Sequence, residues 1–94
     1  MRKIKQTAAF KRDFKREAKG PHRNFLSENF ETLIRTLSND EPLKERHRDH
    51  PLGSEWKDHR DCHVRPDLVL IYRKIGDGTL HLVRLGSHSE LFKK

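Results

Sequence analysis

The sequence predicts an α+β domain in which two N-terminal amphipathic helices pack on one face of a small antiparallel sheet, in the order β-α-α-β-β-β. Apolar residues recur with helical spacing in the first part of the chain, whereas short apolar segments separated by turn residues occupy the last part. Strands joined by such short connections pair antiparallel. Because both helices precede the last three strands, we expect them on one face of the sheet, with the other face open for function.

The first part of the chain is expected to hold a short strand followed by the two helices. Arg2–Thr7 fits a short strand. In Ala8–Lys19 apolar residues recur about every four positions, with Lys and Arg on the other face, which is typical of an amphipathic helix that ends at Gly20-Pro21. The second helix, His22–Leu37, carries the strongest helical pattern, at Leu26, Phe30, Leu33, Ile34 and Leu37.

The C-terminal part is expected to hold three strands, at Glu55–Val64, Leu68–Lys74 and Thr79–Leu85. Pro, Asp and Gly favour turns between them, at Arg65-Pro66-Asp67 and Gly76-Asp77-Gly78. Each strand should therefore pair antiparallel with the next.

Length and charge restrict the class of protein. The 94 residues and 11.2 kDa suit one domain, residues 1–94. Lys and Arg number 21 and Asp and Glu 14, so the net charge is +7, and residues 1–25 alone hold nine basic against two acidic residues. This excess indicates attraction to a polyanion such as nucleic acid, with a solvated basic helix as the alternative.

The chain is expected to have neither a membrane span nor a secretory signal. The longest apolar run, Leu68–Tyr72, is far shorter than the ~20 residues that cross a bilayer. No apolar segment follows the basic N-terminus. The one cysteine, Cys62, cannot form an internal disulfide, which fits a reducing compartment. We therefore expect a cytoplasmic protein with no membrane partner.

Seven histidines in so short a chain indicate that some of them have a chemical role in function. Because side chains alternate along a strand, Lys57, His59, Asp61 and His63 would project from one face of the first of the three strands. Further candidates stand where the strands begin or end, at His50, Asp67 and His88. These groups would converge on one rim of the sheet.

Imidazoles on one rim suit general acid–base catalysis, because the ordinary pKa of histidine, about 6.5, lets it act in both protonation states near neutral pH. RNA cleavage is a reaction that such an acid and base can catalyse: the base removes the ribose 2′-OH proton and the acid protonates the departing 5′-oxygen. Nearby cations neutralise the charge that builds on the phosphoryl oxygens. This reaction needs no metal, because the nucleophile belongs to the substrate.

A metal site is the alternative use of the same residues. The spacings His47-x-x-His50 and His59-x-x-Cys62-His63 supply ligand types that zinc accepts. On a strand, however, Cys62 would point away from His59 and His63, and structural zinc sites more usually contain paired cysteines. We therefore expect no metal and no other cofactor.

Two segments resemble one known family. The motif His50-Pro51-Leu52 with Trp56-Lys57 and the run Arg60–Tyr72 is similar to the YafQ branch of the RelE/ParE toxin superfamily, and Arg84–Phe92 is similar to that family's ending. The similarity covers almost the whole chain in length and element order, and the specific motifs lie in residues 50–92.

This resemblance implies the toxin of a bacterial type II toxin–antitoxin pair: an endoribonuclease that enters the ribosomal A site and cuts mRNA at codons, leaving a 2′,3′-cyclic phosphate and a 5′-hydroxyl. It implies a catalytic set in which His88 is the acid, His63 or His50 is the base and Asp67 orients an imidazole. The positions that the resemblance implies for RNA binding are Asp61 and Phe92. Arg84 and Lys57 are further candidates for binding the RNA, as cations. Phe92 has core packing as its alternative role, and Arg84 has a surface ion pair.

The implied partners are mRNA, the 70S ribosome and a small dimeric, DNA-binding antitoxin (DinJ-like), with operator DNA bound only through the antitoxin complex. Two competing functions remain. One is a toxin of the same fold that cuts nothing and inhibits a protein such as gyrase, which would have no need of paired acid–base groups. The other is a basic nucleic-acid-binding module, which ranks last because the sequence has no helix-turn-helix or RNA-platform motif.

Overall fold

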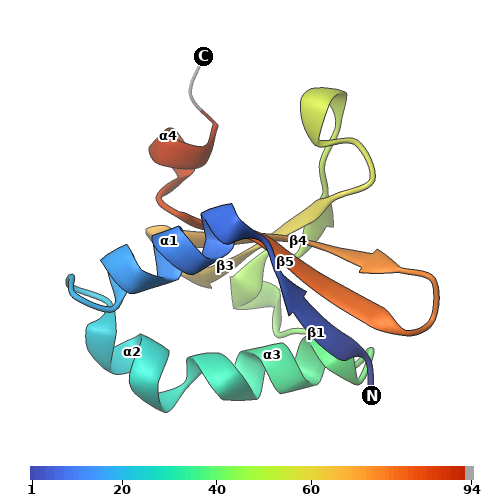
Figure 1. The fold of residues 1–94 in the computed structure, drawn as a ribbon, viewed down its shortest axis with the longest axis horizontal. Coiled ribbons are helices and arrows are strands. Elements are labelled where there is room, and N and C mark those ends of the chain that lie inside the picture. The colour runs from blue at the N-terminus through green and yellow to red at the C-terminus, as the bar shows by residue number, and fades with distance from the viewer. Residues whose placement is uncertain (93–94) are drawn as a thin grey trace.

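The computed structural model describes residues 1–92 and contains one five-stranded sheet in the order β1-β5-β4-β3-β2 (Figure 1). The strands are β1 (Lys3–Gln6), β2 (His50–Pro51), β3 (Arg60–Arg65), β4 (Leu68–Ile75) and β5 (Thr79–Gly86). The helices are α1 (Ala8–Glu17), α2 (Arg23–Glu28), α3 (Phe30–Ser38) and α4 (His88–Leu91). Short 3₁₀ helices occupy Glu45–His47 and Ser54–Trp56. None of the helices in this part of the chain has the length and apolar character needed to cross a membrane.

The predicted α+β class is confirmed, and β3, β4 and β5 form the predicted antiparallel meander. β1 differs: it pairs parallel with β5, with Lys3 opposite Thr79, so the sheet as a whole is mixed. Most of the chain separates β1 from β5, so no hairpin turn dictates their direction.

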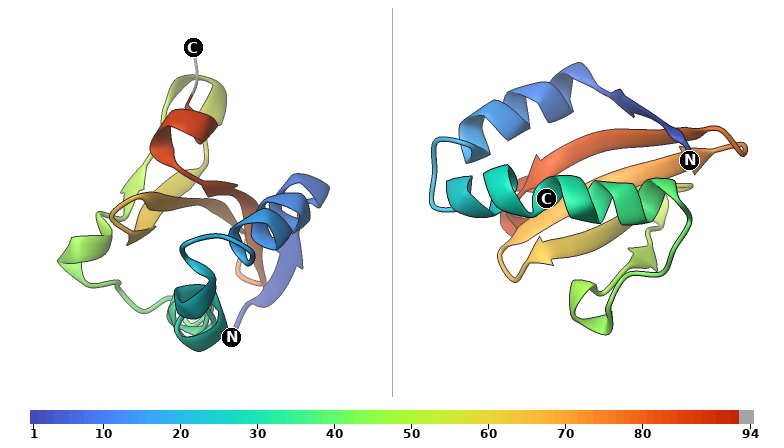
Figure 2. Two further views of the ribbon diagram at one scale, coloured as in Figure 1. Left: turned by 90° about the vertical axis from the view of Figure 1, so that its left-hand side faces the viewer. Right: turned by 90° about the horizontal axis from the view of Figure 1, so that it is seen from below.

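The N-terminal helices cover one face of the sheet, as predicted (Figure 2). The core between them consists of buried apolar side chains from α1, α2, α3 and the sheet: Phe10, Leu26, Phe30, Leu33, Ile34, Leu37, Cys62, Val64, Leu68, Leu70, Tyr72, Leu80, Leu82 and Leu85. The Thr7 hydroxyl starts α1 by accepting the Phe10 amide at 2.9 Å. This helix ends at Glu17, two residues before the predicted end.

The predicted helix His22–Leu37 is instead two helices. It breaks at Asn29, whose backbone (φ −123°, ψ −21°) leaves the helical range, so α2 ends at Glu28 and α3 begins at Phe30. The apolar residues of both pieces still face the sheet. The periodicity therefore located the buried face correctly but did not reveal the break.

The predicted strand Glu55–Val64 is wrong in its first half. Ser54 and Asp58 adopt left-handed φ values of 54° and 70°, which an extended strand does not allow, and β3 begins at Arg60. The preceding loop contributes the unpredicted strand β2, in which His50 pairs with Asp61. After β5, the Ser87 and Glu90 side chains form a capping box that starts α4, also unpredicted.

The second face of the sheet carries a smaller apolar cluster. Val69 and Ile71 from β4 pack with Leu91 of α4, and Leu52, Trp56, Val83 and Phe92 surround them. Figure 1 shows α4 and the loop that precedes β3 rising from this side of the sheet, opposite α3. Functional side chains can reach solvent between these two segments.

Candidate active site

The candidate site is built around the buried carboxylate of Asp61 on β3. Because strand side chains alternate, Cys62 and Val64 enter the core under the helices, whereas Asp61 and His63 face the second side of the sheet. Asp61 and His63 therefore share a strand face, whereas Lys57 and His59 of the predicted group lie before β3 begins. Asp61 is 1% exposed, and its Oδ1 lies 3.1 Å from Nδ1 of His50.

The charges of three predicted catalytic histidines affect the pKa of this carboxylate. Burial raises the pKa of Asp61, and the positive charges of His50, His63 and His88, when these are protonated, oppose that rise. These imidazoles come from β2, from β3 and from the start of α4. The fold thus assembles side chains that are far apart in the sequence.

The His50 side chain has a defined hydrogen-bond partner. Its Nδ1 lies 2.6 Å from the carbonyl oxygen of Arg48, which only accepts, so Nδ1 carries the proton. In the neutral ring Nε2 is then the basic nitrogen. Asp61 Oδ1 lies at ion-pair distance from the same Nδ1 but accepts no hydrogen bond within residues 1–92.

The residue before His50 is anchored to the sheet. Asp49 Oδ1 accepts the hydroxyl of Tyr72 at 2.5 Å and Nε of Arg60 at 3.1 Å. Tyr72 is 1% exposed, and burial, together with the hydrogen bond to Asp49, raises the pKa of its phenol. This cluster fixes the short loop that carries His50. Sequence reasoning missed Asp49, although it stands next to a candidate histidine.

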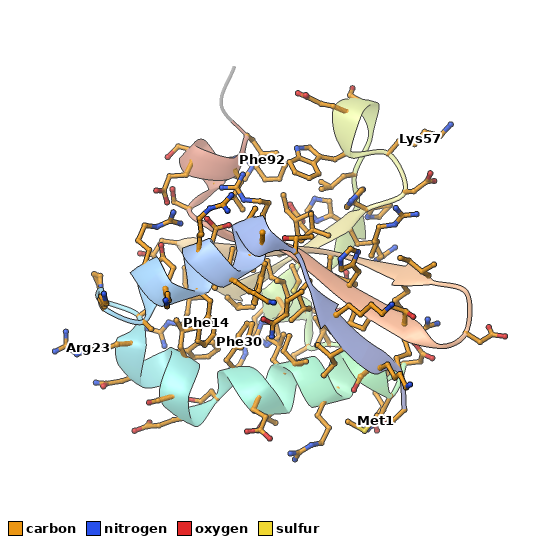
Figure 3. All side chains as sticks on the ribbon, in the orientation of Figure 1. Met1, Phe14, Arg23, Phe30, Lys57 and Phe92 are labelled. Atoms are coloured by element: carbon orange, nitrogen blue, oxygen red, sulfur yellow. The ribbon has the colours of Figure 1, made fainter. Side chains whose placement is uncertain are left out.

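His88 is the first residue of α4, and its ring lies beside Phe92, with 4.6 Å between the ring centroids. Phe92 also meets the edge of Trp56 from the opposite loop, at 6.5 Å. Figure 3 shows the Phe92 side chain directed from the end of α4 toward that loop. A pocket of about 240 Å³ between the two segments is lined by Leu52, Gly53, Ser54, Glu55, Trp56, Leu91 and Phe92. Phe92 is half-buried, so it packs on the apolar cluster and keeps part of its ring accessible.

Arg84 pairs with Asp13 of α1. Its Nε donates to Asp13 Oδ2 at 2.7 Å, and the backbone N–H of Leu85 donates to the same oxygen at 3.0 Å. Arg16, one turn further along α1, donates to the Leu85 carbonyl at 3.2 Å. Beyond the end of β1, Asp13 and Arg16 of α1 thus bond the β5 backbone in place of a neighbouring strand. These bonds fix the end of β5, which leads to His88.

Asp13 is a buried carboxylate that the sequence analysis did not single out. Burial raises the pKa of Asp13, but the hydrogen bonds from Arg84 and Leu85 and the charges of Arg84 and Arg16 outweigh it, so the net direction is downward. The available signal was its position three residues after Phe10, within the apolar stripe of a basic helix. The ion-pair alternative for Arg84 therefore holds, with a mostly buried partner, and the Arg84 side chain is still 32% exposed.

Two predicted site residues make no contact with the group around Asp61 in the described residues. The Asp67 side chain is 76% exposed and lies 3.3 Å from Nε2 of His22, on the helix side of the β3–β4 turn. The His22 side chain is 12% exposed, so this contact is partly shielded from solvent. Lys57 follows the Ser54–Trp56 helix and points away from Phe92 (Figure 3), so it does not share a strand face with Asp61 and His63.

The remaining histidines take structural positions. His47 Nδ1 donates to the carbonyl oxygen of His63 at 2.7 Å, and the His59 ring meets the edge of Trp56 at 5.4 Å. Both are half-buried. Within residues 1–92, no three His, Cys, Asp or Glu side chains gather closely enough to share a metal ion.

Comparisons with known proteins agree on one family. The profile described as "Bacterial toxin of type II toxin-antitoxin system, YafQ" matches residues 2–93. The mRNA interferase toxin YafQ of Escherichia coli K12 is 46% identical over 56 residues, which is 60% of this chain and 60% of that protein. A Haemophilus influenzae protein that carries the toxin YafQ name is 37% identical over 91 residues, covering 94% of this chain and 89% of that protein.

Solved structures show the same fold. YafQ from E. coli BL21(DE3) superposes with a TM-score of 0.82 at 36% identity, covering 98% of this chain and 99% of that one. The YafQ chain of the E. coli DinJ–YafQ complex gives 0.78 at 38% identity, with coverages of 98% and 99%. A copper-bound mutant toxin from Helicobacter pylori gives 0.86 at 39% identity, with coverages of 98% and 100%.

Proposed function

The chain belongs to the YafQ family of bacterial toxins of type II toxin–antitoxin systems, and from this premise we propose that it is an endoribonuclease that cuts mRNA in the ribosomal A site. Its E. coli relatives carry the name mRNA interferase toxin, and the aligned region spans 60% of their length. The observation that carries the proposal is the buried carboxylate of Asp61, which has His50 Nδ1 3.1 Å away and His63 on the same face of β3. The charge of His88, from the start of α4, also acts on the pKa of this carboxylate.

Cleavage through the ribose 2′-OH assigns a step to each group. Nε2 of His50, left basic by the hydrogen bond from Nδ1 to Arg48, takes the proton of the 2′-OH. The 2′-oxygen attacks phosphorus, and the bond from phosphorus to the 5′-oxygen breaks. Protonated His88 gives its proton to that oxygen, which leaves a 2′,3′-cyclic phosphate and a 5′-hydroxyl. His63 is the alternative base, and the Asp61 carboxylate lies 3.1 Å from His50 Nδ1, where it can offset the positive charge that the ring gains with the proton.

Other side chains would hold the RNA. The accessible part of Phe92 offers a surface on which a base can stack, worth roughly 1–3 kcal/mol. The exposed part of the Arg84 guanidinium can face a phosphoryl oxygen while Asp13 holds its Nε. Asp67 remains a candidate through the resemblance alone, because its contact is with His22.

We propose that the partner protein is an antitoxin of the kind seen in the E. coli DinJ–YafQ complex. A groove of about 720 Å³ between α1, α3 and β1 has buried Phe10 and Phe30 at its floor. Half-buried Phe14 and exposed Ile4 offer apolar contact, and Lys11, Arg12 and Lys15 lie along it. Apolar contact flanked by cations suits an amphipathic segment with acidic residues. Because Phe14 also packs on the core, the test uses exposed Ile4: an Ile4→Glu substitution should abolish co-purification with the antitoxin and leave RNA cleavage intact. If the pair still co-purifies, this location is wrong.

Brief induction in cells, followed by mapping of transcript 5′ ends, tests the enzymatic function. We expect cuts in codon register that disappear when translation is blocked. The variants His63→Ala and His88→Ala should lose about 10²–10⁴-fold in rate. His81→Ala, on β5 and outside the group around Asp61, is the matched control and should cut normally.

Two other results would contradict the proposal in different ways. Growth arrest that persists in both histidine variants, with no new 5′ ends, would indicate a toxin that acts on a protein target. Cuts that vanish when divalent cations are chelated in a purified translation reaction, with ribosomes kept intact by polyamines, would contradict the metal-independent reaction.

A further inference from the structure

A second, basic cleft lies at the end of β3, next to the group around Asp61 and sharing His63 with it. Its volume is about 330 Å³, and it lies between the Glu45–His47 helix, α2 and the end of β3. The polar residues that line it are Arg46, His47, His63, Arg65 and Asn29, and Phe25 supplies an aromatic wall. No carboxylate lines it within the described residues.

The two arginines of this cleft are free to bind an anion. Neither Arg46 nor Arg65 appears in an ion pair within residues 1–92, and the nearest acidic residue in sequence to Arg65, Asp67, faces His22. The Arg65 guanidinium lies 5.5 Å from the centroid of the Phe25 ring. This contact restricts the guanidinium while its N–H groups stay available, a common arrangement for binding phosphate.

The cleft adjoins the candidate active site along one strand edge. His50 pairs with Asp61, and two residues further along β3 the His63 carbonyl accepts a hydrogen bond from His47 Nδ1. Two residues of a strand span about 7 Å, a step on the scale of one nucleotide of extended RNA. In the left view of Figure 2, the green Glu45–His47 helix and the β3–β4 turn both lie to the left of and below α4.

We propose that this cleft is a second RNA subsite, which binds a phosphodiester group outside the scissile link through Arg46 and Arg65. The inference rests on the proposed function, since it extends the path of an RNA strand that crosses the group around Asp61. The phosphodiester belongs either to the mRNA being cut or to ribosomal RNA, and these two sources share the chemistry that the cleft recognises.

Binding of a short single-stranded RNA tests the subsite. The probe carries one 2′-deoxy nucleotide at the scissile position, and its Kd is measured over a series of salt concentrations. Each phosphate contact on a single strand contributes about 0.7 to the slope of log K against log salt. Arg46→Gln and Arg65→Gln should each lower that slope by about 0.7 and weaken binding about three- to tenfold.

Arg35→Gln is the matched control, because it removes one charge from an exposed arginine on α3 that pairs only with Glu31. A second set of measurements uses ribosomes without mRNA in place of the short RNA. Loss of affinity for the short RNA assigns the cleft to mRNA, and a loss seen only with ribosomes assigns it to ribosomal RNA. If both cleft variants match the Arg35 variant in both sets, the subsite does not exist.

The subsite and the proposed function can fail separately. If wild-type protein cuts transcripts and the cleft variants bind normally, the subsite alone is wrong. If wild-type protein cuts no RNA in translating cells, the proposed function is wrong. The cleavage rate at saturating RNA should stay unchanged in the cleft variants, and a fall in that rate without a change in Kd would contradict a role confined to binding.

Discussion

Two buried aspartates whose pKa values are shifted in opposite directions provide a test of the site's electrostatics. Asp13 is 3% exposed and accepts hydrogen bonds from Arg84, Arg16 and the Leu85 amide, and these interactions bring its pKa below the ordinary range. Asp61 is 1% exposed, its Oδ1 accepts no hydrogen bond within residues 1–92, and burial raises its pKa. The same change, Asp to Asn, should therefore shift stability in opposite directions at the two positions.

The Asp61→Asn variant should be more stable than the wild type at neutral pH. A buried polar group without a partner costs about 1–3 kcal/mol, and the amide removes the charged part of that cost. At about 4–8 °C per kcal/mol, the melting temperature should rise measurably for a domain of this size. Cleavage should fall at the same time, because the carboxylate beside His50 that offsets the charge gained by the base is gone.

The Asp13→Asn variant should be less stable at neutral pH. Removing one partner of a buried pair costs about 3–5 kcal/mol, and the lower end of that range applies here because the Arg84 side chain is 32% exposed. The two substitutions are nearly isosteric, so each is the control for the packing effect of the other. Thermal and urea unfolding at several pH values provide both measurements.

The pH dependence gives the sign of each contribution. A folded-state pKa above the unfolded value of about 3.9 means that the native state binds more protons, so the contribution of Asp61 to stability falls as pH rises through that window. For Asp13 the folded pKa is lower, so its contribution is present above about pH 4 and is lost as pH falls through the folded value. For both variants, the difference from wild type in the free energy of unfolding should therefore shrink as the pH is lowered, toward about 4 for Asp61→Asn and below about 4 for Asp13→Asn. An Asp61→Asn variant that is destabilised at pH 7, or a difference that does not change with pH, would refute the reasoning.

Three other substitutions test the supports of the site. Tyr72→Phe removes the hydroxyl that donates to Asp49 and should lower the free energy of unfolding in urea by about 1–2 kcal/mol. The cleavage rate should also fall because the His50 loop loosens, and full activity would mean that this anchor does not position His50. Ser87→Ala removes the cap of α4 and should cost about 1 kcal/mol by thermal unfolding, and an unchanged melting temperature would contradict the capping box. Phe92→Leu keeps apolar packing but loses the stacking face, so it should raise KM for RNA with little change in melting temperature, whereas an unchanged KM would assign Phe92 to packing alone.

Local patterns predicted the parts of the fold that depend on periodicity. The Leu26 to Leu37 pattern located the buried face of α2 and α3. Alternation along β3 placed Asp61 with His63 and Cys62 on the opposite face, which the structure shows to be the core side. The break at Asn29 and the start of β3 at Arg60 escaped prediction. Both depend on backbone angles of single residues, such as the left-handed φ of Asp58, that side-chain patterns do not encode.

The candidate site was predictable to the extent that its histidines stand at strand ends. Its supports were not, because they join residues far apart in the chain. Asp13 meets Arg84 and Asp49 meets Tyr72 only after the sheet has formed. Asp67 shows the converse: its place in the sequence suggested the rim near His63, but the β3–β4 turn directs its side chain to His22.

The most direct test of the account replaces the nucleophile in the RNA itself. A translated mRNA with a single 2′-deoxy nucleotide at a mapped cut site is compared with the all-ribose message in the same purified translation reaction. The imidazole mechanism predicts no cut at the deoxy position and normal cuts elsewhere, each leaving a 2′,3′-cyclic phosphate. Continued cleavage at the deoxy position would show that the attacking group is not the 2′-hydroxyl and would contradict the roles given to His50 and His88.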